Sequence, residues 1–101
     1  MRFFFLTLLL ALPGALQAQA TLTASPDGRS LTEALQQAQS GDRIVLRSGI
    51  YREPGLVIDK PIVLEGEPGA VLDGEGKREI LRIAADSVTV RGLTFRNTGV
   101  T

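Results

Sequence analysis

The sequence predicts an all-β fold, a right-handed parallel β-helix, of which the chain would supply roughly the first two to three coils together with a short N-terminal capping helix. Three observations predict this fold. From residue 43 onward, short aliphatic segments recur between glycines, prolines and charged turns. One of these segments returns about 26 residues later, which is typical of a repeat architecture. Pro61 also fits only an edge strand or the first residue of a strand, which is where this repeat places it.

Residues 1–20 have the composition of a secretory signal peptide. Arg2 precedes an apolar run, and Ala18 and Ala20 place small residues at the two positions that a signal peptidase reads. The apolar run is about ten residues long, roughly half of what a membrane-spanning helix needs. We therefore expect cleavage after Ala20, export to the periplasm, and no retained membrane span.

The rest of the chain divides into an N-terminal segment, residues 21–42, and a strand-rich region, residues 43–101. Residues 21–29 are polar and contain a Pro-Asp-Gly sequence, which predicts a turn. Ser30 lies three residues before Glu33, the spacing of a capping box in which each side chain bonds the other residue's backbone N–H. Apolar residues follow at helical spacing, so we expect a capping helix of about ten residues.

Short strands account for the remaining sequence, and most of them alternate between apolar and polar side chains. Such strands could also build a sandwich or a barrel. The expected strands are Arg43–Arg47, Leu56–Asp59, Ile62–Glu65, Ala70–Leu72, Ile80–Ile83, Val88–Arg91 and Leu93–Arg96.

The repeat decides among these architectures. The matched residues are Ile58 with Ile83, Ile62 with Val88, Leu64 with Val90, and Gly66 with Gly92. When coils stack in a parallel β-helix, aliphatic residues at equivalent positions form inward-facing ladders, and glycines mark the bends between faces. The sequence therefore favours stacked coils, with the two matched glycines as structural residues.

Composition excludes several kinds of function. The chain has 11 basic and 11 acidic residues, and their signs alternate without a basic block, so neither nucleic acid nor an anionic membrane surface is an expected partner. There is no histidine or cysteine, and the single methionine is Met1. Because copper is bound by sulfur or imidazole ligands, we expect no metal or other cofactor in this segment.

Five carboxylates are candidates for metal binding or catalysis, and they are Asp59, Glu65, Glu67, Asp73 and Glu75. They lack the regular spacing of a calcium loop. Glycoside hydrolysis needs two carboxyl groups about 5 to 9.5 Å apart, and the spacing of Asp59 and Asp73 does not place them in one ladder. We therefore predict that this segment is not an enzyme and that these carboxylates are solvated turn residues.

Several other side chains admit both a functional and a structural interpretation. Asn97 ends a strand and could begin a stacked asparagine ladder, which would be structural. Tyr51 could stack on a sugar, but a half-buried ring at the core edge is commoner. Four arginines should point outward and could dock an acidic partner, although loose pairing with neighbouring carboxylates is the simpler expectation. They are Arg47, Arg82, Arg91 and Arg96.

The order of these motifs resembles the N-terminal region of the NosD family, which belongs to the CASH group of β-helix domains. The resemblance is carried by the capping helix and by residues 41–53, 56–66, 70–76 and 88–99. It implies a non-enzymatic periplasmic protein that works with ABC-type transporter subunits and copper-protein maturation partners in assembling the copper-sulfur centre of nitrous oxide reductase. NosD-like proteins have many more coils, so the chain is expected to be an N-terminal fragment.

Two other classes of protein share these sequence features. One is a secreted carbohydrate-active or carbohydrate-binding β-helix protein, which would show acidic and basic residues aligned on one face with exposed aromatic rings. The other is a structural surface protein that binds no ligand.

Overall fold

The computed structural model describes residues 19–77 and 79–99. Most of the predicted signal peptide, including Ala18, lies outside the described residues. The elements follow the order β1 (Thr21–Ala24), α1 (Leu31–Gln37), β2 (Arg43–Leu46), β3 (Gly49–Tyr51), β4 (Leu56–Ile58), β5 (Val63–Gly66), β6 (Ala70–Asp73), β7 (Leu81–Ile83), β8 (Thr89–Arg91) and β9 (Thr94–Arg96).

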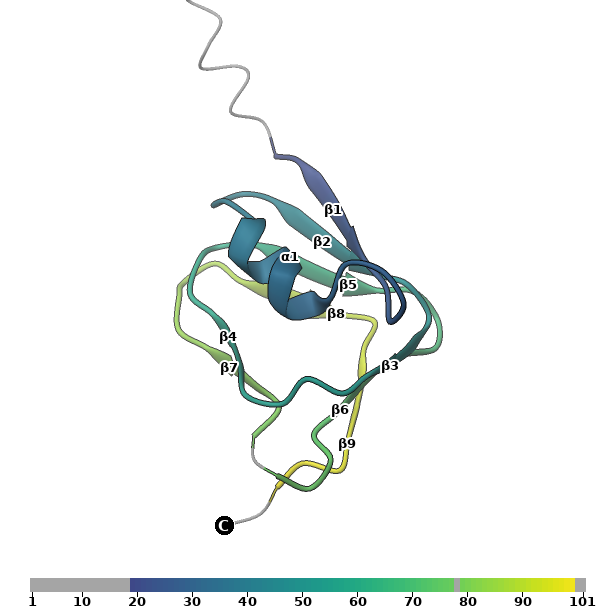
Figure 1. The fold of residues 1–101 in the computed structure, drawn as a ribbon. Helices are drawn as coiled ribbons and strands as arrows, with labels where there is room; N and C mark the ends of the chain where they lie inside the picture. The colour runs from purple at the N-terminus through teal and green to yellow at the C-terminus, as the bar shows by residue number, and fades with distance from the viewer. Residues whose placement is uncertain (1–18, 78, 100–101) are drawn as a thin grey trace, which may run out of the picture.

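The strands form three parallel sheets, ordered β1-β2-β5-β8, β3-β6-β9 and β4-β7. Strands β2, β3 and β4 make the first coil, β5, β6 and β7 the second, and β8 and β9 belong to the third. Figure 1 shows the sheets as three sides around the core, with α1 lying over one end. The predicted parallel β-helix is thereby confirmed.

The register agrees with the repeat found in the sequence. Ile58 is paired with Ile83, and Leu64 with Val90. Gly66 and Gly92 stack at the following corner so closely that a Cβ atom on either would lie 2.5 Å from the other's carbonyl oxygen. No side chain fits at these two positions, so glycine is needed here for close backbone approach.

Inward-facing side chains form ladders along the stacked coils, and their exposure rises toward the third coil. In one ladder, Leu72 is 1% exposed and Phe95, its register partner on β9, is 46% exposed. In another, Ile58 is 1% exposed and Ile83 is 50% exposed. Phe95 on β9 and Ile83 on β7 each lie on the last strand of their sheet, so they pack against a neighbouring strand on one side only and form the open end of the described core.

The opposite end of the core is covered by β1 and α1. Residues 21–29 were expected to form a turn, but the first four make β1, which pairs in parallel with β2. The turn follows, where Gly28 N donates to Ser25 O at 3.2 Å. Strand β3 was also absent from the sequence-based expectation. Both strands are short and only partly apolar, so pairing with a neighbouring strand, and not local propensity, decides their conformation.

Helix α1 begins after Ser30, whose Oγ accepts a hydrogen bond from Glu33 N at 3.0 Å. The described contacts of the Glu33 carboxylate are with Gln37 Nε2, at 3.3 Å, so the reciprocal half of the expected capping box is not seen. Glu53 in the first coil takes its place. Its carboxylate accepts from Leu31 N at 3.1 Å and from Thr32 N at 2.8 Å, which ties the start of the helix to the coil beneath it.

Lys60 secures the other end of α1. Its Nζ donates to the carbonyl oxygens of Leu35 and Ala38, which lack partners within the helix because they belong to its last turn. A cation at this end also interacts favourably with the helix dipole. Both ends of α1 are therefore anchored by charged side chains from the first coil, while Leu31 and Ala34 are buried against the core.

Replacing Glu53 by alanine should lower the free energy of unfolding by about 1–2 kcal/mol, because two backbone N–H groups at the helix start lose their acceptor. Replacing Glu33 by alanine is the matched control, and it should cost only a few tenths of a kcal/mol, roughly the value of an exposed i,i+4 pair. Urea denaturation followed by circular dichroism measures both. Equal effects of the two variants would contradict the assignment of Glu53 as the principal cap.

The exposure gradient predicts unequal effects within one ladder. Leu72→Ala should destabilise the fold by about 2–5 kcal/mol, because it opens a cavity in a packed core. Phe95→Ala should cost less than about 1.5 kcal/mol, because its ring is already partly in water. Thermal unfolding of the two variants side by side tests this, and a larger loss for Phe95→Ala would show that the third coil is buried against something else.

Candidate functional site

Three of the predicted carboxylates, Glu65, Asp73 and Glu75, lie in ion pairs. Glu65 on β5 is 3.3 Å from Arg43 on β2 and 3.5 Å from Arg91 on β8. Glu75 is 3.5 Å from Lys77 Nζ. In the part of the chain that the structure describes, no three histidine, cysteine, aspartate or glutamate side chains are placed to hold a metal ion.

Asp59 and Asp73 lie on different sheets. Asp59 directly follows β4, whereas Asp73 ends β6. They therefore belong to different faces of the helix, as their spacing suggests, and do not form a carboxylate pair across one ladder. Asp59 is exposed, as expected, whereas Asp73 is buried, so the prediction of a solvated turn carboxylate is wrong for Asp73.

Asp73 is the centre of a polar cluster, here called the Asp73 corner, which it forms with Glu75, Arg96 and Asn97. The residue is 4% exposed. Its Oδ1 accepts from Glu75 N at 2.8 Å and from Asn97 Nδ2 at 3.2 Å. Its Oδ2 accepts from Arg96 Nε at 3.1 Å. The carboxylate is thus held by its own turn and by two side chains of the following coil.

These contacts hold the pKa of Asp73 below its ordinary value. The hydrogen bond from Glu75 N is the largest cause, burial opposes it, and the bonds from Asn97 and Arg96 lower the pKa further. A carboxylate with all of these donors is stabilised in its charged form. Its lone pairs are directed at protein donors, so the corner joins the second and third coils and has little capacity left for a cation.

Asn97 was expected to begin a ladder of asparagines. The structure places its amide against Asp73 of the preceding coil, which makes a mixed pair between coils. Its backbone has a positive φ of 53°, which asparagine tolerates better than most residues. A Cβ atom on Gly74 would lie 2.8 Å from Asn97 O, so glycine before the turn allows the two coils to approach. The sequence Asp73-Gly74 followed by Arg96-Asn97 one coil later is the signal that could have revealed the corner.

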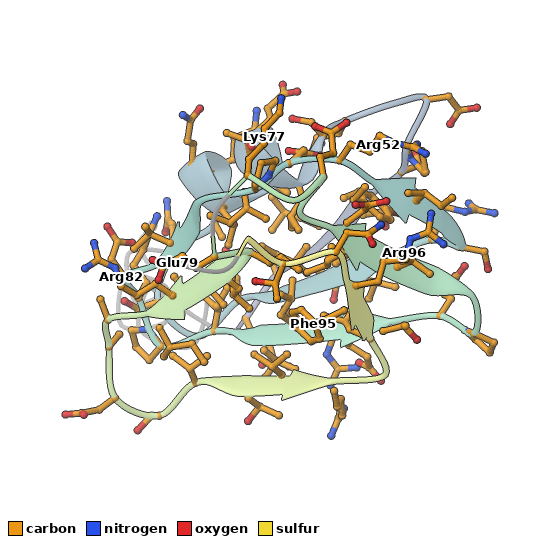
Figure 2. The ribbon with its side chains drawn as sticks, turned by 90° about the horizontal axis from the view of Figure 1, so that it is seen from below. Arg52, Lys77, Glu79, Arg82, Phe95 and Arg96 are labelled. Atoms are coloured by element: carbon orange, nitrogen blue, oxygen red, sulfur yellow. The ribbon has the colours of Figure 1, made fainter. Side chains whose placement is uncertain are left out.

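The outward-pointing arginines mostly have carboxylate neighbours. Arg91 pairs with Glu65, Arg96 with Asp73, and Arg82 lies 4.0 Å from Glu79. Figure 2 shows Arg82 and Glu79 at one edge of the molecule, away from Arg96. Arg47 is exposed. The Arg91–Glu65 and Arg82–Glu79 pairs are the more exposed ones, and pairs of this kind are worth about 0–1 kcal/mol each.

Tyr51 is a core residue and not a sugar platform. It is among the fully buried side chains, and its hydroxyl lies 2.7 Å from Arg47 O and 3.0 Å from Ala24 O. Burial raises the pKa of Tyr51 to about 12. The ring was expected to be half-buried at the core edge. It lies deeper because β1 and the turn after it cover that edge.

A shallow groove of about 580 Å³ runs between α1 and β4. Leu35, Leu56 and Val57 supply its apolar part, and Asp59 and Lys60 lie at its rim. The Lys60 ammonium is engaged by the helix carbonyls. Thr32 and Gln36 also line the groove, which is therefore mixed in polarity, and Asp59 is its one exposed carboxylate.

Asp73→Asn should lower Tm by about 5 °C at pH 7, since the variant loses the charge that Arg96 and the turn N–H recognise. Because the folded-state pKa is depressed, the contribution of ionised Asp73 is present above its unfolded pKa of about 3.9 and is lost as the pH falls through the folded value. The difference in Tm between variant and parent should therefore shrink below about pH 4. Asp86→Asn, in an exposed turn, is the control and should leave Tm nearly unchanged. A difference for Asp73→Asn that is independent of pH would argue against a charged carboxylate.

Comparison with known proteins adds one relative. The chain is 39% identical over 81 residues to the "Probable ABC transporter binding protein NosD" of Pseudomonas aeruginosa. The match covers 79% of the chain and 18% of the relative, so the chain spans less than a fifth of that protein's length. No family model and no solved structure matches the chain. On this similarity and on its stacked parallel coils, the chain is a NosD-like parallel β-helix segment.

Proposed function

We propose that this segment is the N-terminal scaffold of a non-enzymatic accessory protein that works beside an ABC-type transporter in the periplasm. The observation that carries the proposal is the similarity to a probable ABC transporter binding protein over 81 residues. It is supported by an architecture in which the carboxylates are used for ion pairs and for bonds between coils. The outer surface then offers partner proteins a fixed shape on which positive and negative charges alternate.

Export is part of the same proposal. The sequence of residues 1–20 is that of a secretory signal, and the described fold begins with β1 at Thr21, immediately after the proposed cleavage site. The helix of the described residues is too short to cross a membrane. We infer that a signal peptidase releases the chain by cutting after Ala20.

The finer role that we propose is assistance in assembling the copper-sulfur centre of nitrous oxide reductase, which the family resemblance implies. Copper would be cargo in this process. The chain has no histidine or cysteine and only Met1 carries a thioether, so the ligands for that cargo would come from partners or from other parts of the accessory protein. The coils described here would then position those partners.

A carbohydrate-binding role has weaker support in this segment. Sugar sites on β-helices would use exposed aromatic rings, but Tyr51 and Phe95 both belong to the inward-facing ladder that includes Leu72. Phe95 is exposed because it lies at the open end of the core, and not because it stands on an outer face. We therefore rank the carbohydrate function second.

A chimeric protein tests the proposal. The region of the Pseudomonas aeruginosa relative that matches this chain is replaced by residues 21–101, and the chimera is expressed in a strain that lacks its own NosD. We expect nitrous oxide reduction and the copper content of the purified reductase to return to within about threefold of the level given by the native gene. The transporter subunits should also co-purify with the chimera.

The control is the same chimera carrying Leu72→Asp, which buries a charge in the core and should abolish rescue through misfolding. A chimera that is exported at normal levels and folded, yet leaves the reductase without copper, would contradict the proposed role. Retention of the chimera on a polysaccharide column under the same conditions would favour the carbohydrate function instead.

A further inference from the structure

Asp42 binds the backbone at the start of β1. The side chain is buried, and its Oδ1 accepts a hydrogen bond from Ala20 N at 2.9 Å. Its Oδ2 accepts from Gln39 N at 2.8 Å, just beyond α1. On the same residue, Ala20 O accepts from Arg43 N at 2.9 Å. One carboxylate thus joins the beginning of β1 to the exit of α1.

The proposed cleavage site lies within this arrangement. Signal peptidase hydrolyses the Ala20–Thr21 bond, and the water that is consumed leaves a carboxylate on Ala20 and a new α-amino group, protonated to an ammonium, on Thr21. Ala20 departs with the signal peptide. Asp42 then loses the Ala20 N–H donor, and Arg43 N loses the Ala20 carbonyl acceptor. A buried carboxylate that loses one of its donors favours a replacement.

We propose that, in the exported protein, the new α-ammonium of Thr21 binds Asp42 in place of Ala20 N–H. Consecutive residues are about 3.8 Å apart at their Cα atoms, so the new terminal nitrogen lies within about one residue of the position that Ala20 N occupied. Processing would thereby replace a hydrogen bond from a neutral N–H to the carboxylate by an ion pair in which the ammonium donor and the carboxylate acceptor are both charged. The inference rests on the proposed cleavage after Ala20.

The cations near Asp42 are bound to other partners, so Asp42 is available to the new α-ammonium. Lys60 faces Asp42 and contributes to keeping its pKa below the ordinary value, after the hydrogen bonds from Ala20 and Gln39. The Lys60 ammonium, however, donates to the carbonyl oxygens of Leu35 and Ala38. The Arg43 guanidinium pairs with Glu65. Neither cation makes a described hydrogen bond to Asp42.

The test uses the chain expressed with its own signal and recovered from the periplasm. Mass spectrometry reads the N-terminus, and reductive ¹³C-methylation followed by NMR titration reads the pKa of the α-amine while preserving its charge. We expect an N-terminus at Thr21 and an α-amine pKa above the usual range of about 7.7–8.0. In Asp42→Asn, that pKa should fall back toward this range. Asp27→Asn, which removes the same charge from an exposed turn, is the matched control and should leave it raised.

Stability provides a second readout that does not depend on the Asn variant folding well. Because pairing raises the folded-state pKa of the amine, its contribution is present at lower pH and is lost as the pH rises through that pKa. Tm of the processed chain should therefore fall between about pH 8 and pH 10. In a synthetic chain of residues 21–101 with an acetylated α-amine, this part of the fall should be absent.

The outcomes separate the two claims. An N-terminus at a residue other than Thr21 would overturn the proposed cleavage and this inference with it. An N-terminus at Thr21 with the same α-amine pKa in the parent, Asp42→Asn and Asp27→Asn would leave the cleavage standing and overturn the pairing with Asp42. Identical pH dependence of Tm in the free and acetylated chains would also overturn the pairing.

Discussion

The register between parallel strands is the constraint on which the whole structure depends. Each strand is only three or four residues long, and such short strands are not stable alone. They persist because backbone hydrogen bonds to the coil above and below fix equivalent residues in line. Once Leu64 lies under Ile44, and Val90 under Leu64, every inward position continues a ladder of apolar contacts. In a fold of this kind, stability is approximately a sum of contributions from coils and from the interfaces between neighbouring coils.

Polar side-chain contacts help to hold the coils in this register. Asp73 and Asn97 join the second coil to the third, Glu65 lies between arginines of the strands on either side, and Glu53 and Lys60 hold the helix onto the first coil. In each case a side chain bonds across coils instead of along its own strand. These polar contacts therefore keep the coils and the helix aligned with one another.

The sequence was sufficient to predict the ladders and the class of fold, because the matched pairs Ile58–Ile83 and Leu64–Val90 are apolar in both repeats. It was insufficient for β1 and β3, whose residues have weak local preference and become strands only when a neighbour pairs with them. The capping box was also an incomplete guide. Ser30 caps the helix as the spacing predicts, but the second acceptor at the helix start is Glu53, which is distant in sequence. The Asp73 corner was not predicted for the same reason. It depends on the loop lengths that bring Asn97 beneath Asp73, and neither residue alone indicates those lengths.

The connections between strands vary more than the strands themselves. The connection from β6 to β7 is longer than the one from β3 to β4, yet β4 and β7 remain paired with Leu56 beside Leu81. The longer connection at this corner is therefore accommodated without loss of the pairing between β4 and β7. Such a corner is a natural place for evolutionary change, because an insertion there can alter what the molecule presents to a partner while the framework beneath it is inherited intact. The same property makes it a suitable position for grafting an engineered recognition loop.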